Sequence, residues 1–239
     1  MKEGIGLRLL SRGGFTLTEI LVAMALTGIV VGAIYTTYKS QQDTYIVQDQ
    51  VGEMQLNLRA AAHIMASDIR MAGYNPKSVP NLAGFAATLP RNTANPWDDV
   101  AVPPSSVQFA FTLDSNGNGA LDDNDAEQIA YRRNAASRTL ERFRPSSNSW
   151  VPVAEGIEAL DFVYLDGNGT DITGTIGTDL ARVRLVEITL LARTKKWDRE
   201  FRNTATYSNR PGTWTFTAPG DNFRRRLLTT TVLCRNTGL

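Results

Sequence analysis

The chain has 239 residues and a formal net charge of +1, with 25 Lys and Arg against 24 Asp and Glu. This near-neutral balance argues against a dedicated nucleic-acid-binding protein, which would carry a strong positive excess. The length accommodates one membrane anchor and one domain of moderate size. Because Cys234 is the only cysteine, no internal disulfide can form.

The first elements in chain order are a short basic leader, residues 1–14, and an apolar segment. From Phe15 to about Tyr38 the only charged side chain is Glu19. This segment is long enough for roughly 30 Å of helix, which is enough to cross a bilayer. An acidic side chain costs about 2.5–3.5 kcal/mol at the centre of a bilayer. We therefore expect Glu19 to have a specific partner.

Two simpler explanations of this region are an ordinary single-pass anchor with a tolerated glutamate and a secretory signal peptide. An ordinary anchor does not explain why a basic leader, a Gly-Gly-Phe junction and a glutamate at this position occur together. In a secretory signal the apolar core precedes the small residues of the cleavage site, whereas here it follows Gly13 and Gly14. The signal peptide therefore fits worse.

The arrangement resembles the class III signal of the type IV pilin superfamily. The resemblance implies that a prepilin peptidase cuts between Gly14 and Phe15 on the cytoplasmic side and methylates the new Phe15 amine. It also implies that Glu19 pairs with the Phe15 ammonium of a neighbouring subunit. Such a pair would neutralise two charges that lipid penalises and would set the register between subunits. The leader holds three basic residues and one acidic residue, so the mature chain would carry a net charge of −1.

Gly28 and Gly32 form a G-x-x-x-G spacing inside the apolar segment, which permits close approach of two helices. The spacing predicts helix packing inside a fibre, and incidental glycines in a membrane helix explain it equally well. The basic leader predicts a cytoplasmic N-terminus and a head on the far side of the inner membrane.

The helix is predicted to continue beyond the membrane to residue 74. Its apolar residues recur at three- and four-residue steps and form one stripe. They are Val47, Val51, Met54, Leu58, Ala61, Met65, Ile69 and Ala72. Gly73-Tyr74-Asn75-Pro76 supplies the stop. The stripe predicts packing on a sheet, with a coiled-coil dimer as the alternative, and His63 lies off the stripe as a predicted surface residue.

The remainder, residues 75–239, is predicted to be a β-rich head. An irregular proline-rich connection over residues 75–105 precedes six segments with strand character. These are Val107–Leu113, Glu127–Arg133, Thr139–Phe143, Ile157–Leu165, Val183–Arg193 and Arg226–Leu233. The predicted fold class is α+β: a long N-terminal helix packed on an antiparallel sheet, as in type IV pilins. The predicted division is 1–14 leader, 15–38 membrane or fibre-core half of the helix, 39–74 amphipathic half, and 75–239 head.

The segment 114–125 matches the twelve-position calcium loop of an EF-hand. Its predicted ligands are Asp114, Asn116, Asn118, the backbone carbonyl of Ala120, Asp122 and Asp125. Asp125 replaces the usual bidentate glutamate, and the flanks are strands, so calcium would bind a loop graft. The alternative is a polar turn without metal. The second turn, residues 166–169, has too few acidic side chains for a metal and is predicted to be a hairpin only.

Arginines cluster on neighbouring predicted strands, namely Arg132, Arg133, Arg138, Arg142 and Arg144, and three more precede the last strand. A DNA-contacting face is conceivable, but solvated strand faces and ion pairs between subunits explain the cluster better, so nucleic acid is not an expected partner. The sequence holds a single histidine and no G-x-S-x-G, Cys–His or metalloprotease motif. We therefore expect no enzymatic activity.

Three further stretches resemble the PilW family of minor pilins. They are residues 42–76, the Asp/Asn/Gly loop leading into residues 127–131, and the C-terminal segment 226–239. The resemblance implies a low-abundance subunit that joins other minor and major pilins, primes pilus assembly and sits near the tip, where an adhesin is one conceivable neighbour. It also implies contact with the inner-membrane assembly platform before export to the cell surface. The alternatives are a J-type minor pseudopilin of type II secretion and an anchored periplasmic enzyme or ligand-binding domain.

Overall fold

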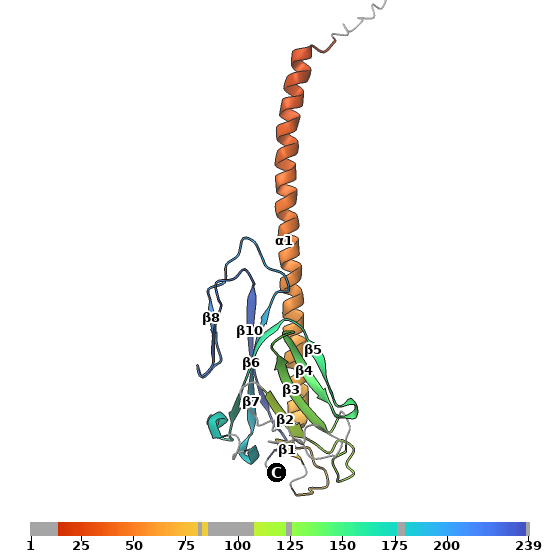
Figure 1. Ribbon diagram of the computed structural model, residues 1–239, viewed down its shortest axis with the longest axis vertical. Coiled ribbons are helices and arrows are strands. Elements are labelled where there is room, and N and C mark those ends of the chain that lie inside the picture. Colours follow the sequence, from red (N-terminus) through yellow and green to blue (C-terminus); the bar gives the residue numbers. More distant parts are fainter. Residues whose placement is uncertain (1–13, 81–82, 86–107, 123–125, 176–179, 238–239) are drawn as a thin grey trace, which may run out of the picture. The chain divides into compact units, whose positions relative to one another are not determined.

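The computed structural model describes residues 14–80, 83–85, 108–122, 126–175 and 180–237. The chain divides into two compact units, one reaching to Gln48 and the other comprising Asp49–Leu239. We call the second the head unit. The long helix α1, Leu17–Met71, contributes to both (Figure 1). Val107 and Asp125, which belong to predicted elements, lie outside the described residues.

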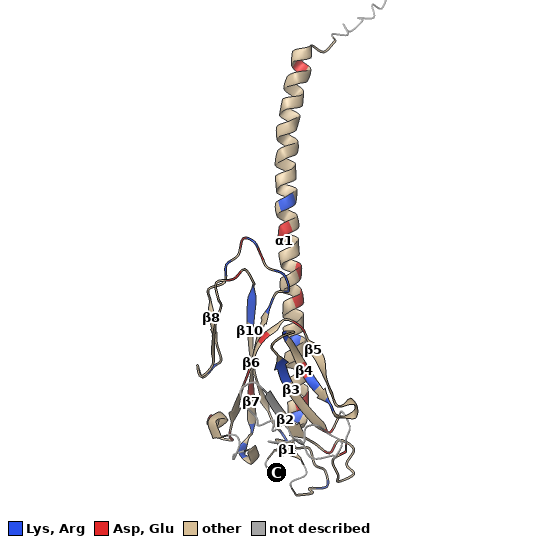
Figure 2. Ribbon diagram, viewed as in Figure 1, with Lys and Arg blue, Asp and Glu red and all other residues tan. Residues whose placement is uncertain are grey.

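The N-terminal part of α1 is an exposed apolar helix. Ile29, Ile34 and Tyr35 are each more than 60% exposed, and Figure 2 shows no charged residue between Glu19 and Lys39. Within the described part of the chain, α1 is the one helix long and apolar enough to cross a membrane. This agrees with the predicted membrane segment.

Within the head unit, α1 buries the predicted stripe. Met54, Leu58, Met65 and Ile69 are at most 6% exposed, whereas His63 is exposed, as predicted. Sheet residues cover the stripe, so the coiled-coil alternative is wrong. The helix ends just before Gly73, whose φ of +78° lies in the left-handed region that glycine tolerates best.

Five antiparallel strands form the first sheet, in the order β1-β2-β3-β4-β5. Their bounds are Gly84–Phe85, Gln108–Thr112, Gln128–Asn134, Thr139–Arg144 and Ser149–Ala154. Strand β5 was not predicted, because Pro152 interrupts its pattern. A proline is tolerated there because β5 lies at the edge of the sheet. The short 3-10 helix η2, Pro145–Ser147, connects β4 to β5.

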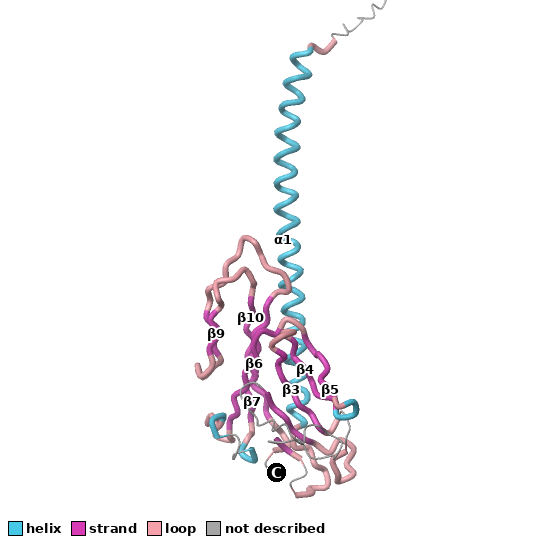
Figure 3. Tube along the Cα trace, in the orientation of Figure 1, coloured by secondary structure: helices cyan, strands magenta, loops and turns pink. Residues whose placement is uncertain are grey.

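The second sheet has the antiparallel order β10-β7-β6, with bounds Arg225–Leu233, Leu185–Arg193 and Ile157–Leu165. A separate hairpin pairs β8, Thr206–Ser208, with β9, Thr215–Thr217. Two 3-10 helices, η3 Thr173–Thr175 and η4 Leu180–Arg182, lie between β6 and β7. Figure 3 shows that every strand belongs to the head unit.

A shared core joins both sheets to α1. The large side chains that fill it are Phe111, Tyr131, Phe162, Tyr164, Ile188 and Leu190, all fully or almost fully buried. A polar contact also links α1 to the first sheet: the Tyr131 hydroxyl donates to the Asp68 carboxylate at 2.6 Å, and Arg142 Nε donates to the same oxygen at 3.1 Å. Cys234 is a buried free thiol. The long helix packed on antiparallel strands confirms the predicted fold class.

Candidate functional site

The predicted cleavage junction lies immediately before α1. Gly14, Phe15 and Thr16 precede the first helical residue, Leu17, and the Phe15 side chain is 86% exposed. The bond between Gly14 and Phe15 therefore lies in non-helical, exposed backbone, the form in which a peptidase can bind it. Cleavage and methylation there stay predictions.

Glu19 forms a capping box with Thr16 at the start of the helix. The Glu19 carboxylate accepts hydrogen bonds from the Thr16 backbone N–H at 2.8 Å and from the Thr16 hydroxyl at 2.9 Å. In return, the Glu19 N–H donates to the Thr16 hydroxyl oxygen at 3.3 Å. This arrangement holds the carboxylate in the first helical turn, close in sequence to the predicted new amine. Sequence reasoning missed Thr16, although the T-x-x-E spacing of a capping box was visible.

The glycine pair in the apolar segment has no close neighbour in this chain. A Cβ atom built at Gly28 or Gly32 would meet nothing within 4 Å among the described residues. Neither glycine therefore provides space for another part of the chain among the residues that the structure describes. A role in packing between subunits stays a prediction.

The predicted calcium loop is organised around Asp114, whose side chain is buried. Asp114 Oδ1 accepts backbone hydrogen bonds from Gly117 at 2.7 Å and from Asn118 at 3.1 Å, and Oδ2 accepts one from Gly119 at 2.9 Å. These bonds fold the loop tightly around one carboxylate. The first position of an EF-hand loop is likewise a carboxylate.

Three of the other predicted ligands meet at one point. The side-chain amides of Asn116 and Asn118 donate to the same oxygen of Asp122, at 2.8 and 2.9 Å. Glu127, which sequence reasoning did not include, is fully buried and accepts from Ser115 Oγ at 3.0 Å and from the Asp122 N–H at 2.7 Å. Among the described residues no three His, Cys, Asp or Glu side chains form a metal-ready group. Because Asp125 lies outside the described residues, the calcium site stays a prediction.

The second Asp/Gly turn reverses the chain, as predicted: Leu165 and Asp171 form an isolated antiparallel bridge across it. The turn is also held by its own acid. Asp166 Oδ1 accepts the N–H groups of Asn168 and Thr170, both at 2.9 Å. The Thr170 and Asn168 bonds, with the Arg182 guanidinium, lower the pKa of Asp166. The chain then forms η3 and η4 before β7 begins, so this segment is a turn within a longer connection.

The arginines on the first sheet are engaged in the head unit. Arg132 forms an ion pair with Glu141 at 2.8 Å and stacks over the Trp150 ring at 4.1 Å. Arg142 pairs with Asp68, and Arg133 donates to the Ile157 carbonyl. These ion pairs lie within the subunit, whereas solvated strand faces and ion pairs between subunits were expected. That nucleic acid is not a partner stays a prediction.

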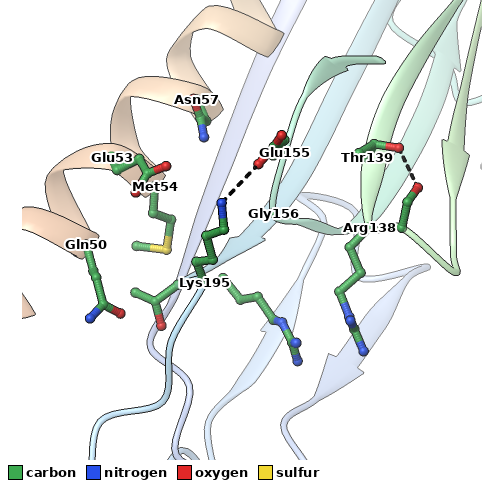
Figure 4. Close-up of a pocket in the computed structure, with 12 residues that line it drawn as sticks. Gln50, Glu53, Met54, Asn57, Arg138, Thr139, Glu155, Gly156 and Lys195 are labelled. Atoms are coloured by element: carbon green, nitrogen blue, oxygen red, sulfur yellow. Dashed lines mark hydrogen bonds and ion pairs between the residues drawn. The ribbon is translucent and has the colours of Figure 1, made fainter. Parts of the chain in front are cut away.

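A pocket of about 360 Å³ lies where α1 passes the turns of the first sheet and the end of β7. Figure 4 shows Gln50, Glu53 and Asn57 entering it from α1, opposite Glu155, whose carboxylate lies 3.7 Å from Lys195 Nζ. Most of the lining residues are polar or charged, and Met54 is an apolar one among them. The one histidine of the chain is not among the lining residues.

Two family models match the chain. The prokaryotic N-terminal methylation motif matches residues 10–35, and prepilin peptidase-dependent protein B matches residues 48–210. Among solved structures, the chain is similar to a type IV-like pilin from Thermus thermophilus, with 20% sequence identity and a TM-score of 0.43 over 76% of this chain and 97% of that chain. No curated protein matches the chain significantly. The predicted resemblance to prepilins is thereby confirmed.

Proposed function

This chain belongs to the family of prepilin peptidase-dependent protein B, and on that premise we propose that it is a minor pilin of a type IV pilus. One observation supports the proposal: the N-terminal methylation motif matches residues 10–35, and the model of the prepilin peptidase-dependent family matches residues 48–210. In this proposal the protein is a structural subunit and not an enzyme.

The geometry of the N-terminus supports a role in assembly. After cleavage, the Phe15 amine would be a cation one turn away from the Glu19 carboxylate. Glu19 Oε2 accepts two hydrogen bonds from Thr16, so the carboxylate is already fixed in direction before a neighbouring subunit arrives. In this proposal the amine of one subunit binds the carboxylate of the next, and a mismatched register leaves two charges unpaired in an apolar fibre core.

In this proposal the apolar part of α1 is the membrane anchor before assembly and part of the fibre core after it. Its exposed surface needs either lipid or other helices around it, because apolar side chains this exposed are unstable in water. Gly28 and Gly32 offer a surface for close helix packing. We propose that the N-terminus is cytoplasmic, that the head is periplasmic, and that prepilin peptidase, the assembly platform and other pilins are the partners.

A calcium ion in the 114–125 loop is part of the proposal. Asp114, Asp122, Asn116 and Asn118 carry side-chain oxygens of the kind that calcium prefers. In the structure the two asparagine amides donate N–H bonds to Asp122, so in this proposal both amides turn their oxygens toward the ion. Bound calcium would neutralise clustered carboxylates and so stabilise a head that has no disulfide.

Electron microscopy of sheared surface fibres from a strain lacking this protein tests the proposed function. We expect few or no fibres, with restoration on complementation by the wild-type chain. Normal fibre number and length in the deletion strain would contradict the pilus assignment. The chain would then be assigned to a type II secretion pseudopilus, for which exoprotein export is the assay.

A further inference from the structure

The connection that follows β7 carries an unusual combination of side chains. Residues 195–202 read Lys-Lys-Trp-Asp-Arg-Glu-Phe-Arg, and we call them the 195–202 loop. Trp197 is 62% exposed and is the one exposed aromatic side chain among the described residues of the head unit. A tryptophan ring exposed to water loses the apolar contact that usually stabilises it.

The loop is fixed in place. The Lys196 N–H donates to the side chain of Gln50 on α1 at 3.3 Å, and the Asp198 N–H donates to the Asn222 carbonyl at 2.8 Å. Arg224 forms an ion pair with Asp198 at 2.8 Å and lies over the Phe201 ring. The exposure of Trp197 is therefore built into a supported loop.

Within the 195–202 loop the basic side chains outnumber the acidic ones, and the acids that lie next to it, Glu53 and Glu155, line the pocket on the Lys195 side of the loop. Lys196, Arg199 and Arg202 are exposed, and none forms an ion pair with a described residue. The acid within the loop that faces solvent is Glu200, because Asp198 is neutralised by Arg224. Lys195 makes only a long, solvent-exposed pair with Glu155 at 3.7 Å, which screens its charge weakly.

Chain connectivity relates this loop to the membrane anchor. Lys196 contacts Gln50, the second residue of the head unit, and residues 39–49 separate it from the end of the apolar segment. The loop thus lies at the end of the head unit where the anchor joins it. Exposed Trp beside Lys and Arg is the composition that binds the interface of a bilayer: the ring lies at headgroup level, and each basic residue is attracted to an anionic surface.

We propose that the 195–202 loop docks the head unit on anionic phospholipid headgroups while the subunit is in the membrane. Trp197 inserts at headgroup level, and Lys196 and Arg199 bind lipid phosphates. The contact would hold the head against the bilayer before assembly and would be given up when the subunit is extracted. This inference uses the membrane anchoring of the proposed function but not its assignment to a pilus.

Tryptophan quenching in vesicles tests the proposal. The full chain is reconstituted into phosphatidylglycerol or phosphatidylcholine vesicles whose acyl chains are brominated close to the headgroup. In phosphatidylglycerol we expect stronger quenching of the wild type than of Trp197→Phe. The difference between the two is the quenching of Trp197, because both proteins contain the other tryptophans. The quenching attributed to Trp197 should be lost in phosphatidylcholine and at high salt, which screens the attraction.

Two further variants complete the test. Lys196→Gln combined with Arg199→Gln should reduce the Trp197 quenching in phosphatidylglycerol. Arg235→Gln, an exposed arginine beyond the opposite end of β10, should leave it unchanged. All variants should float with the vesicles, because the apolar part of α1 is intact. Equal quenching of wild type and Trp197→Phe, or equal Trp197 quenching in both lipids, would overturn the proposal. The proposal would also be overturned if Trp197 were not quenched and Trp197→Phe were missing from fibres. The loop would then be assigned to a contact with another protein.

Discussion

Glu19 combines two properties that are separable by substitution: its charge and its hydrogen bonds to Thr16. Glu19→Gln keeps a side-chain oxygen that can accept from Thr16 but removes the charge. We expect Glu19→Gln and Glu19→Ala to be cleaved at Gly14 and yet to be lost from fibres, because the Phe15 ammonium then has no partner. Immunoblots of sheared fibres and of the membrane fraction measure both effects.

Thr16→Ala is the matched control for Glu19. It removes the cap, which costs about 0.5–2 kcal/mol of helix stability, and keeps the carboxylate. We expect it to enter fibres. Normal incorporation of Glu19→Gln would show that the charge pair is not needed for assembly.

Asp161 on β6 is a second residue with a distinct electrostatic environment. Burial raises its pKa to about 6, against the opposing hydrogen bond from Asn209, and the nearby Glu187 and Asp171 carboxylates add to the rise. The unfolded value is about 3.9. Because the folded pKa is the higher one, the stability linked to this group is fully present below about pH 4 and is lost as the pH rises through about 6.

We therefore expect Asp161→Asn to gain stability over the wild type when the pH rises from about 4 to about 7.5. Urea denaturation of the full chain in detergent at both pH values measures the difference. Asp166→Asn is the control of opposite sign, because hydrogen bonds lower the pKa of Asp166. The loss of unfolding free energy caused by Asp166→Asn should grow as the pH rises. A pH-independent difference between wild type and Asp161→Asn would contradict the account.

At the scale of elements, two leucines on α1 allow the effect of burial on stability to be measured apart from the effect of helix propensity. Leu58 is 1% exposed and Leu56 is 68% exposed. We expect Leu58→Ala to lower the free energy of unfolding by about 2–5 kcal/mol, because it leaves a cavity under the sheet. Leu56→Ala should change it by no more than about 0.5 kcal/mol. Urea denaturation of both variants checks this, and equal losses would show that the stripe is not the packed face.

The 114–125 loop gives an element-scale prediction about metal. Isothermal titration of the full chain with calcium should show saturable heat, and calcium should raise the melting temperature relative to chelator. Both effects should disappear in Asp114→Ala, which removes a carboxylate predicted as the first ligand, and persist in Asp166→Asn in the other Asp/Gly turn. If the wild type shows neither heat nor stabilisation, the loop is a turn only.

Most elements were predictable from the sequence because their signals are local. The apolar stripe predicted the buried face of α1, and Gly73 predicted its end. Strands β6, β7 and β10 differ from the predicted ranges by no more than two residues at any end. Strand β5 was not predicted because Pro152 interrupts its strand pattern, although an edge strand tolerates a proline. The division into two sheets was not predictable, because it depends on strand order, which no local pattern fixes.

The candidate sites show the same limit. Thr16 could have been recognised from its spacing to Glu19. Glu127 could not, because its burial beside Ser115 and Asp122 depends on the fold of β3 against the preceding loop. The exposure of Trp197 could not be predicted either, because it depends on how the 195–202 loop folds in the head unit.

At the scale of the whole molecule, the chain combines an apolar helix that is unstable in water with a head whose core is complete. In the proposed function such a chain needs lipid before assembly and neighbouring helices after it. Membership in a prepilin peptidase-dependent family supports the proposal that this change of surroundings begins with removal of the basic leader, which would expose the amine that is to pair with Glu19.

The measurement that tests this central claim most directly is mass spectrometry of purified, sheared pili. The account predicts a peptide of this chain that begins at N-methylated Phe15, present at low abundance in the fibre fraction. Absence of the chain from fibres, with the leader still attached in the membrane fraction, would contradict it.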